Sequence, residues 1–150
     1  MFPWRTINGE EASAYYAAGT AQYHINADIM YALRKYVQAT GDDQILRDYG
    51  AEMLVETARL WVDLGFFSDA KGGKFCINSV TGPDEYNTVV NNNAYTNLMA
   101  RENLRYASDT VEAMRSKEPD AYRALEDKTA LEPAEVETWR RARRAHVRTV

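Results

Sequence analysis

Apolar side chains recur at helical spacing along two long stretches near the start of the chain, and each stretch predicts an amphipathic helix. The first helix is expected over residues 20–39, with an apolar stripe of Ile25, Ile29, Leu33 and Val37 that is widened by Ala21, Ala32 and Tyr36. The second is expected over residues 42–64, with a stripe of Leu46, Tyr49, Met53, Thr57, Leu60, Trp61 and Leu64. Gly41 is the one breaker between the two helices, which predicts an antiparallel helical hairpin.

The helical pattern stops at Gly65 and resumes near Asn93. Between these points, residues 74–80 have the composition of a short strand, and Phe66-Phe67 is the nearest partner, which predicts a small β-hairpin. We expect this hairpin to carry the turn that contains Gly82, Pro83, Asp84 and Glu85.

A third helix is expected over residues 93–114, where the Asn91–Asn93 triplet supplies an N-cap and the apolar side consists of Ala94, Leu98, Ala107, Val111 and Met114. Pro119 and Pro133 then begin two shorter helices. The chain is therefore predicted to be mainly α-helical, with one small β-hairpin.

Both ends of the chain lack a clear period. Residues 1–20 contain a turn at Asn8-Gly9 among polar and aromatic side chains, which is typical either of a loop that lines a ligand pocket or of an ordinary exposed loop. Beyond Trp139 the sequence is rich in Arg, Ala and Val without an apolar stripe, so we expect residues 140–150 not to pack on the body.

Composition narrows the class of protein. A chain of 150 residues with 45% hydrophobic content can form one domain with a core and is not disordered. Five of the 18 basic residues lie after Trp139, which leaves 13 basic against 22 acidic groups, or a net −9, in residues 1–139. Such an acidic body argues against a nucleic-acid partner, and no apolar run approaches the ~20 residues of a membrane span. We expect a cytoplasmic protein, since no signal peptide is apparent.

Cysteine and histidine are too few for several common kinds of site. Cys76 is the single cysteine, so it cannot form an internal disulfide, and its place in the expected strand predicts a small core residue. The chain has only His24 and His146, without a clustered third ligand, so no metal site is expected.

Asp84 and Glu85 are the strongest candidates for chemistry. They are adjacent carboxylates on a tight turn, with Tyr86 beside them, and we expect the turn to hold them rigidly at an opening rather than on a solvated face. One of them is then a candidate general acid. The alternative is a polar turn that only precedes a helix N-cap.

His24 and Asp28 form a second candidate. They are four residues apart at the start of the first expected helix, so they lie on one face and can pair or point together into a cavity. The alternative is a hydrogen-bonded structural histidine.

Four motifs, taken together, resemble glycoside hydrolase family 65, which contains inverting disaccharide phosphorylases and some hydrolases. They cover roughly residues 1–115 and occur in one order along the chain. The motifs are Phe2-Pro3-Trp4, Asn8-Gly9-Glu10-Glu11, His24-Ile25-Asn26-Ala27-Asp28-Ile29, and Gly82-Pro83-Asp84-Glu85-Tyr86 with Asn91-Asn92-Asn93-Ala94-Tyr95-Thr96-Asn97.

The resemblance implies part of a six-hairpin (α/α) barrel in which Glu85 is the general acid. Glu85 would protonate the glycosidic oxygen of an α-linked glucose disaccharide while inorganic phosphate, the co-substrate, attacks the anomeric carbon from the opposite face, giving β-glucose 1-phosphate. Such an acid must stay protonated near neutral pH, which requires a low-dielectric or acidic neighbourhood, and Asp84 could supply the repulsion. Alternatively, Asp84 only caps the turn.

The resemblance also implies the residues that bind the substrate. It assigns Trp4, Arg5, His24 and Asn26 to the acceptor sugar, and it counts Asp84 and Tyr86, on either side of Glu85, among the substrate-binding residues. The stretch after Trp4 looks closer to kojibiose-type than to maltose-type members. Full-length relatives are often homodimeric, and no cofactor is implied.

The chain also departs from the family pattern. Members are several times longer, so residues 1–139 are expected to be a piece of the catalytic barrel, inactive alone, and residues 140–150 an Arg-rich tail outside the family pattern. Two alternatives within the resemblance are a hydrolase that uses water and a non-catalytic sugar-binding remnant. A helical interaction module would predict an internal repeat of 30–50 residues, and the sequence has none.

Overall fold

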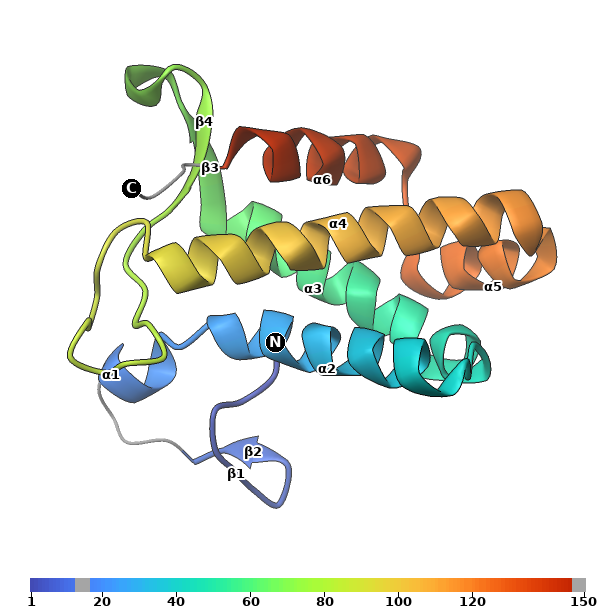
Figure 1. The fold of residues 1–150 in the computed structure, drawn as a ribbon, viewed down its shortest axis with the longest axis horizontal. Helices are drawn as coiled ribbons and strands as arrows, with labels where there is room; N and C mark the ends of the chain where they lie inside the picture. Colours follow the sequence, from blue (N-terminus) through green and yellow to red (C-terminus); the bar gives the residue numbers. More distant parts are fainter. Residues whose placement is uncertain (13–16, 147–150) are drawn as a thin grey trace.

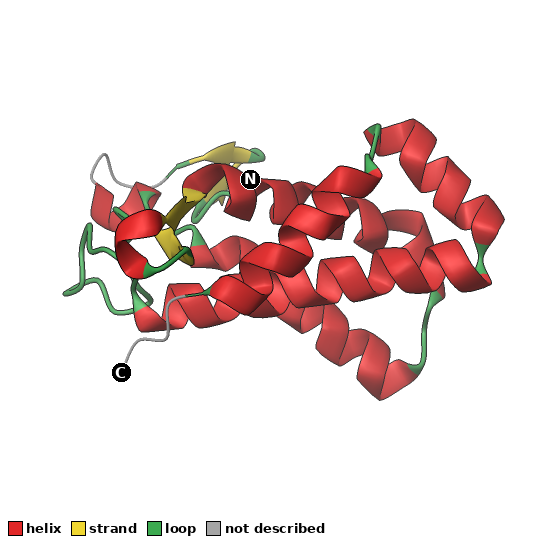
Figure 2. Cartoon of the chain, turned by 90° about the horizontal axis from the view of Figure 1, so that it is seen from above, coloured by secondary structure: helices red, strands yellow, loops and turns green. Residues whose placement is uncertain are grey.

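The computed structural model describes residues 1–12 and 17–146. The chain is mainly helical, with two short two-stranded hairpins near one end (Figures 1 and 2). The long helices are α2 (His24–Thr40), α3 (Ala51–Leu64), α4 (Ala94–Lys117), α5 (Pro119–Thr129) and α6 (Pro133–Ala145). The shorter elements are β1 (Thr6–Ile7), β2 (Glu10–Glu11), α1 (Ala17–Thr20), a π-helical turn (Leu46–Gly50), β3 (Gly65–Ser68), a 3₁₀ turn (Asp69–Lys71) and β4 (Lys74–Ile77).

Helix α4 is the centre of the bundle, because it packs against α2, α3, α5 and α6 (Figure 1). The predicted hairpin is present: α2 and α3 run in opposite directions, and α2 ends at Gly41. Gly41 has the left-handed backbone (φ 71°) that glycine adopts freely, and its N–H donates to the Val37 carbonyl at 2.8 Å. The helix begins four residues later than expected, and residues 17–20 form the separate turn α1.

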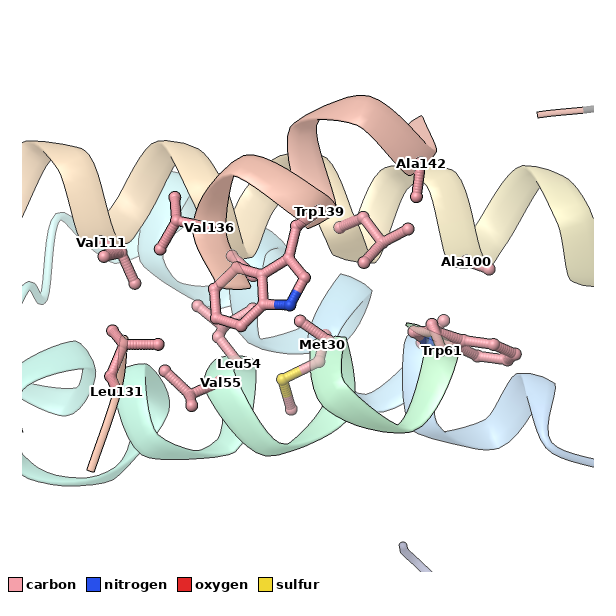
Figure 3. Close-up of a cluster of buried hydrophobic side chains, with 14 of the residues drawn as sticks. Met30, Leu54, Val55, Trp61, Ala100, Val111, Leu131, Val136, Trp139 and Ala142 are labelled. Carbon is pink, nitrogen blue, oxygen red and sulfur yellow. The ribbon is translucent and has the colours of Figure 1, made fainter. Parts of the chain in front are cut away.

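The core lies between α2, α3, α4 and α6, and its largest fully buried side chains are Trp61 and Trp139 (Figure 3). On α2 the buried apolar residues are Ala27 and Met30, whereas the predicted Ile25 and Ile29 are only half-buried. The predicted stripe is thus confirmed only in part: Ile29 and Leu33 pack against the core, whereas Ala32 and Tyr36, which were expected to widen the stripe, are exposed. Apolar residues occur on more than one side of α2, and contact with α3 and α4 selects the side with the small Ala27.

In the stripes predicted for residues 42–64 and 93–114, single apolar members are also exposed instead of buried. Tyr49 is 66% exposed and Leu98 is 48% exposed, although both were expected in the core. Thr57, Trp61, Val111 and Met114 are buried as predicted. An apolar residue at helical spacing is thus buried only where another element of the chain covers it.

The predicted β-hairpin is confirmed. Strands β3 and β4 pair antiparallel, with Gly65 opposite Ile77 and Phe67 opposite Phe75. A Cβ at Gly65 would lie 2.1 Å from the Phe75 ring, so glycine allows this close approach. The second strand ends at Ile77 rather than Val80, because Val80 instead pairs with Val90 across the following loop. Cys76 is buried in this strand, as expected.

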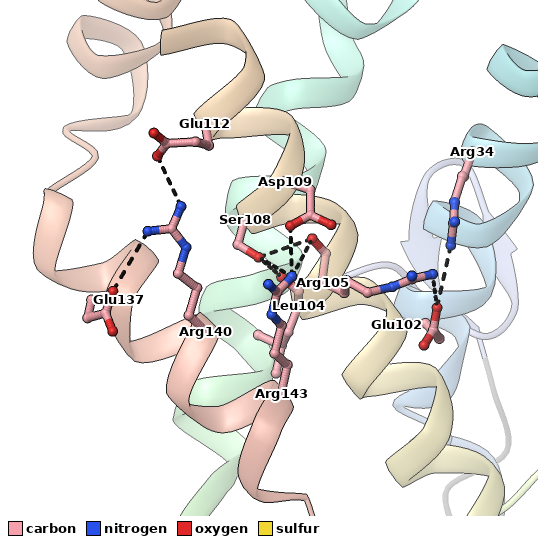
Figure 4. A network of polar contacts seen from close by, with 10 residues as sticks. All are labelled: Arg34, Glu102, Leu104, Arg105, Ser108, Asp109, Glu112, Glu137, Arg140 and Arg143. Atoms are coloured by element: carbon pink, nitrogen blue, oxygen red, sulfur yellow. Dashed lines mark hydrogen bonds and ion pairs between the residues drawn. The ribbon is translucent and has the colours of Figure 1, made fainter. Parts of the chain in front are cut away.

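Residues 140–146 pack on the bundle, so the expectation of an unpacked end after Trp139 was wrong for them. Ala142 is fully buried against the core. Arg143 donates to Asp109 at 2.8 Å and to Ser108, and Arg140 donates to Glu112 at 3.0 Å (Figure 4). The arginines pair with acidic groups of α4 while the small alanine enters the core, which explains why an Arg-rich segment without a stripe still packs.

Residues 147–150 of the predicted tail lie outside the described residues, and the domain boundary placed after Trp139 stays a prediction. In the part of the chain that the structure describes, no helix has the length and apolar character needed to cross a membrane.

Candidate active site

The loop that carries Glu85 is fixed to the bundle at both ends. Val80 and Val90 bond each other across its base, and the Thr81 N–H donates to the Ala21 carbonyl at 3.0 Å. Asn92 bonds the backbone of Ile77 in both directions, as donor of its N–H and as acceptor through Oδ1. Asn92 therefore anchors the end of this loop to β4.

Asn93 has the N-cap role that the sequence predicted. Its Oδ1 accepts from the Thr96 N–H at 3.0 Å, at the first turn of α4.

Val89 has φ 53°, a left-handed backbone that is strained for a β-branched residue. Strain of this kind gathers at functional sites, and it lies here four residues after Glu85.

The turn around Asp84 is confirmed, but its surroundings differ from the expectation. Asp84 Oδ1 accepts from the Tyr86 N–H at 3.2 Å, so this carboxylate braces the turn. Asp84, Glu85 and Tyr86 are all exposed, and Tyr86 is 99% exposed. The expectation that the two carboxylates avoid a solvated face was wrong for this chain, because nothing within the described residues covers the loop.

Glu85 has one side-chain partner that sequence reasoning missed. Its Oε1 accepts from Gln22 Nε2 at 3.0 Å, although the two residues are 63 positions apart. The Gln22 side chain is buried between α1 and α2, so it fixes the direction of the Glu85 carboxyl group. No sequence signal singled out Gln22, since the pairing arises only when the loop docks on Ala21.

His24, at the first position of α2, is 3% exposed and belongs to a hydrogen-bonded chain of three residues. Its Nδ1 lies 2.8 Å from Asp28 Oδ2, and the other oxygen of Asp28 accepts from the Tyr95 hydroxyl at 2.9 Å. Burial, and then the hydrogen bond to Asp28, raises the pKa of Tyr95 to about 12. The predicted pairing of His24 with Asp28 is confirmed, whereas the contact of Asp28 with Tyr95 was not predicted from the sequence.

The N-terminal segment lies against this cluster. The Phe2 N–H donates to Asn26 Oδ1 at 2.8 Å, and Asn26 Nδ2 donates to the Tyr23 carbonyl, so Asn26 ties this segment to α2. The Trp4 ring meets the His24 ring edge-on, with 6.4 Å between centroids.

The predicted turn at Asn8-Gly9 joins β1 to β2, and both residues have positive φ. Glu11 on β2 accepts from the backbone N–H groups of Trp4 and Arg5, at 2.8 and 3.3 Å. Arg5 itself is exposed.

The structure thus brings Trp4, His24 and Asn26 together at the start of α2, and it attaches Glu85 two residues upstream through Gln22. Asp84 and Tyr86 lie on the same loop as Glu85, and both are exposed. A separate hollow of about 720 Å³ lies between the β3–β4 turn and α6, and the predicted site residues, all of them described, do not line it. Among the described residues no group of His, Cys, Asp and Glu could hold a metal ion.

Known proteins share this sequence and fold. Residues 1–149 match the model of the glycosyl hydrolase family 65 central catalytic domain. The chain is 56% identical over 142 residues to an alpha,alpha-trehalose phosphorylase of Thermoanaerobacter brockii, and the match covers 95% of this chain and 18% of the relative. A kojibiose phosphorylase of Caldanaerobacter subterraneus is 38% identical over 122 residues, covering 81% of this chain and 16% of the relative.

A solved structure gives the same result for the fold. The structure of a putative kojibiose phosphorylase from the human microbiome superposes with a TM-score of 0.84 at 31% identity, and it covers 97% of this chain and 21% of that one. The chain therefore spans about a fifth of the length of the relatives that it matches. It belongs to the glycosyl hydrolase family 65 central catalytic domain family.

Proposed function

We propose that this chain supplies the general acid and part of the acceptor-sugar site of an inverting disaccharide phosphorylase. The observation that carries the proposal is the Glu85 carboxyl group, which a buried glutamine directs from a doubly anchored loop beside the His24 cluster. Trehalose is the first substrate to test, because the identity to the trehalose phosphorylase, 56%, exceeds the 38% to the kojibiose phosphorylase.

In the proposed reaction, Glu85 gives its proton to the glycosidic oxygen as the bond from that oxygen to the anomeric carbon breaks. A phosphate oxygen forms the new bond to the anomeric carbon from the opposite face, which inverts its configuration. The products are β-glucose 1-phosphate and glucose. The exposure of Glu85 supports a further part of the proposal: other segments of a six-hairpin (α/α) barrel cover this loop and make it dry enough for a protonated acid.

The test is a chimera, because the chain spans about a fifth of its relatives. The matching segment of the Thermoanaerobacter brockii trehalose phosphorylase is replaced by this chain, and formation of glucose 1-phosphate from trehalose and phosphate is measured. A general acid contributes roughly 10²- to 10⁴-fold to the rate, so Glu85→Gln should lower kcat by a factor in that range. Glu137→Gln is the matched control, since Glu137 is an exposed acid on α6.

The outcomes of these assays distinguish a phosphorylase from a hydrolase and test the role of Glu85. Glucose released at an undiminished rate without phosphate would favour a family hydrolase. An active chimera that keeps its rate after Glu85→Gln would contradict the role of Glu85. We expect the 150-residue chain by itself to bind sugar without turning it over, and phosphorolysis by this chain alone would contradict that expectation.

A further inference from the structure

The His24 ring has one polar atom that the fold leaves unused. Nδ1 bonds Asp28, but Nε2 is buried and has no hydrogen-bond partner among the described residues. Buried polar atoms are almost always paired, so an unpaired one calls for an explanation. The two rings beside it are Trp4 and Tyr95, whose centroids lie 6.4 and 5.5 Å from that of His24.

Asp28 determines which nitrogen of His24 carries the proton. An ionised carboxylate only accepts hydrogen bonds, so the hydrogen is assigned to Nδ1, which lies 2.8 Å from Asp28 Oδ2. A neutral ring protonated on Nδ1 has a bare lone pair on Nε2. Nε2 is then an acceptor that needs a donor, such as a hydroxyl group.

Tyr95 holds Asp28 in this orientation. Its hydroxyl donates to Asp28 Oδ1 at 2.9 Å, from the first turn of α4, so the carboxylate is fixed by both helices. Because the pKa of Tyr95 is raised to about 12, this hydroxyl stays protonated and remains a donor at any ordinary pH. The two oxygens of Asp28 thus have separate partners: Oδ2 pairs with His24 Nδ1, and Oδ1 accepts from the Tyr95 hydroxyl.

Resting on the proposed function, we propose that Asp28 and Tyr95 are positioning residues that present His24 Nε2 as the acceptor for a hydroxyl group of the bound sugar, beside Trp4. Trp4 is the neighbouring ring that can move, since it is 40% exposed and its ring meets that of His24 only edge-on. Rotation of its side chain opens Nε2 and leaves an indole face for the apolar side of the sugar.

The tautomer can be measured on the 150-residue chain by ¹⁵N NMR of its two histidines, in a buffer well above the ordinary imidazole pKa of ~6.5. We expect a protonated Nδ1 and an unprotonated Nε2 at His24. Asp28→Asn should move the proton to Nε2. The Tyr95 hydroxyl would still donate to the amide oxygen of the asparagine, so the amide nitrogen would face Nδ1 as a donor and Nδ1 would have to accept. A His24 ring that is protonated on Nε2 in the unaltered chain would overturn the proposal.

Titration with trehalose tests the ligand role. We expect the His24 Nε2 resonance to shift, with His146 unchanged as the internal reference, and the dissociation constant to rise about tenfold in Asp28→Asn and in Tyr95→Phe. Tyr36→Phe is the matched control: Tyr36 makes the same kind of bond, to Asp42 at 2.9 Å, at the exposed far end of α2. Its affinity should equal that of the unaltered chain.

If trehalose or glucose at saturating concentration leaves Nε2 unshifted, the sugar-acceptor role of His24 is overturned. If Asp28→Asn loses its helical circular dichroism, the affinity of Tyr95→Phe and the Nε2 shift of the unaltered chain still test the role of His24. Failure of the proposed function is read separately, from the rate of the chimera with and without Glu85.

Discussion

At the residue scale, three buried side chains between α3 and α4 form a hydrogen-bonded chain: Trp61, Asn103 and Thr57. Trp61 Nε1 donates to Asn103 Oδ1 at 2.9 Å, and Asn103 Nδ2 donates to Thr57 Oγ1 at 3.0 Å. Thr57 in turn donates to the Met53 carbonyl at 2.8 Å. Every member is nearly fully buried and has a partner, so α3 and α4 are held in one register by directional bonds as well as by apolar contact.

Asn103→Ala should lower the free energy of unfolding by about 1–3 kcal/mol, because it leaves the indole N–H of Trp61 buried without an acceptor. Urea unfolding followed by tryptophan fluorescence measures this loss. Gln38→Ala is the control, since Gln38 is exposed on α2 and should change the stability little. Equal stability of the two variants would show that water or another group replaces Asn103.

At the scale of elements, the Glu135 carboxylate both caps the start of helix α6 and pairs with Arg59 of α3. Glu135 accepts from the Glu132 N–H at 2.9 Å, which completes a capping box, and its two oxygens accept from Arg59 at 2.7 and 2.9 Å. The hydrogen bond to Arg59 is the main reason why the pKa of Glu135 is lowered from its ordinary value of 4.5. The same pair raises the pKa of Arg59.

Glu135→Gln should cost about 1 kcal/mol of stability at pH 7, from the loss of the ion pair and the weaker cap. A carboxyl group with a lowered folded pKa stabilises above the unfolded value of 4.5, and the contribution disappears as the pH falls through the folded value. The difference between the two proteins should therefore be constant near neutral pH and vanish in acid. Thermal unfolding across this pH range measures it.

The control for this prediction is Glu137→Gln on the same helix. Its carboxylate is 70% exposed and lies 3.8 Å from Arg140, so its removal should change the stability little at any pH. A stability difference for Glu135→Gln that persists in acid would show that packing, and not charge, holds the start of α6.

On the scale of the whole molecule, apolar residues remain exposed along the α2–α4 side. Tyr31 is 46% exposed, Tyr95 is 38% exposed and Leu98 is 48% exposed. Tyr95 and Leu98 lie three residues apart on α4, and Tyr31 is close enough to affect the titration of Tyr95. Exposed apolar surface of this kind is covered in larger assemblies, and this chain spans about a fifth of its relatives.

We predict that the isolated chain associates with itself through this side at micromolar concentration. Leu98→Glu should shift sedimentation velocity profiles toward the monomer and leave the circular dichroism unchanged, because a charge resists burial. Ile7→Glu should leave the association as it is, because Ile7 is 68% exposed on β1 and belongs to neither α2 nor α4. A monomeric chain at all concentrations would contradict the prediction.

The sequence by itself determined the features that depend on neighbours along the chain. Gly41 ends α2, Asn93 caps α4, Pro119 and Pro133 open α5 and α6, and the β3–β4 hairpin follows from its strand and turn residues. Backbone preference and local hydrogen bonds act within a few residues, so they can be read without the fold. The pairing of His24 with Asp28 is local in the same sense.

Only the tertiary structure decided which side of each helix is covered and what surrounds the site. Ala27 is buried in place of Ile25 because α2 docks on α3 and α4. Three contacts join residues that are far apart in the chain: Arg143 with Asp109, Gln22 with Glu85, and Tyr95 with Asp28. Such contacts depend on how helices dock, and a helix with apolar residues on two sides gives no local preference for either. The exposure of Glu85 has the same cause, since coverage of its loop depends on elements outside its own sequence.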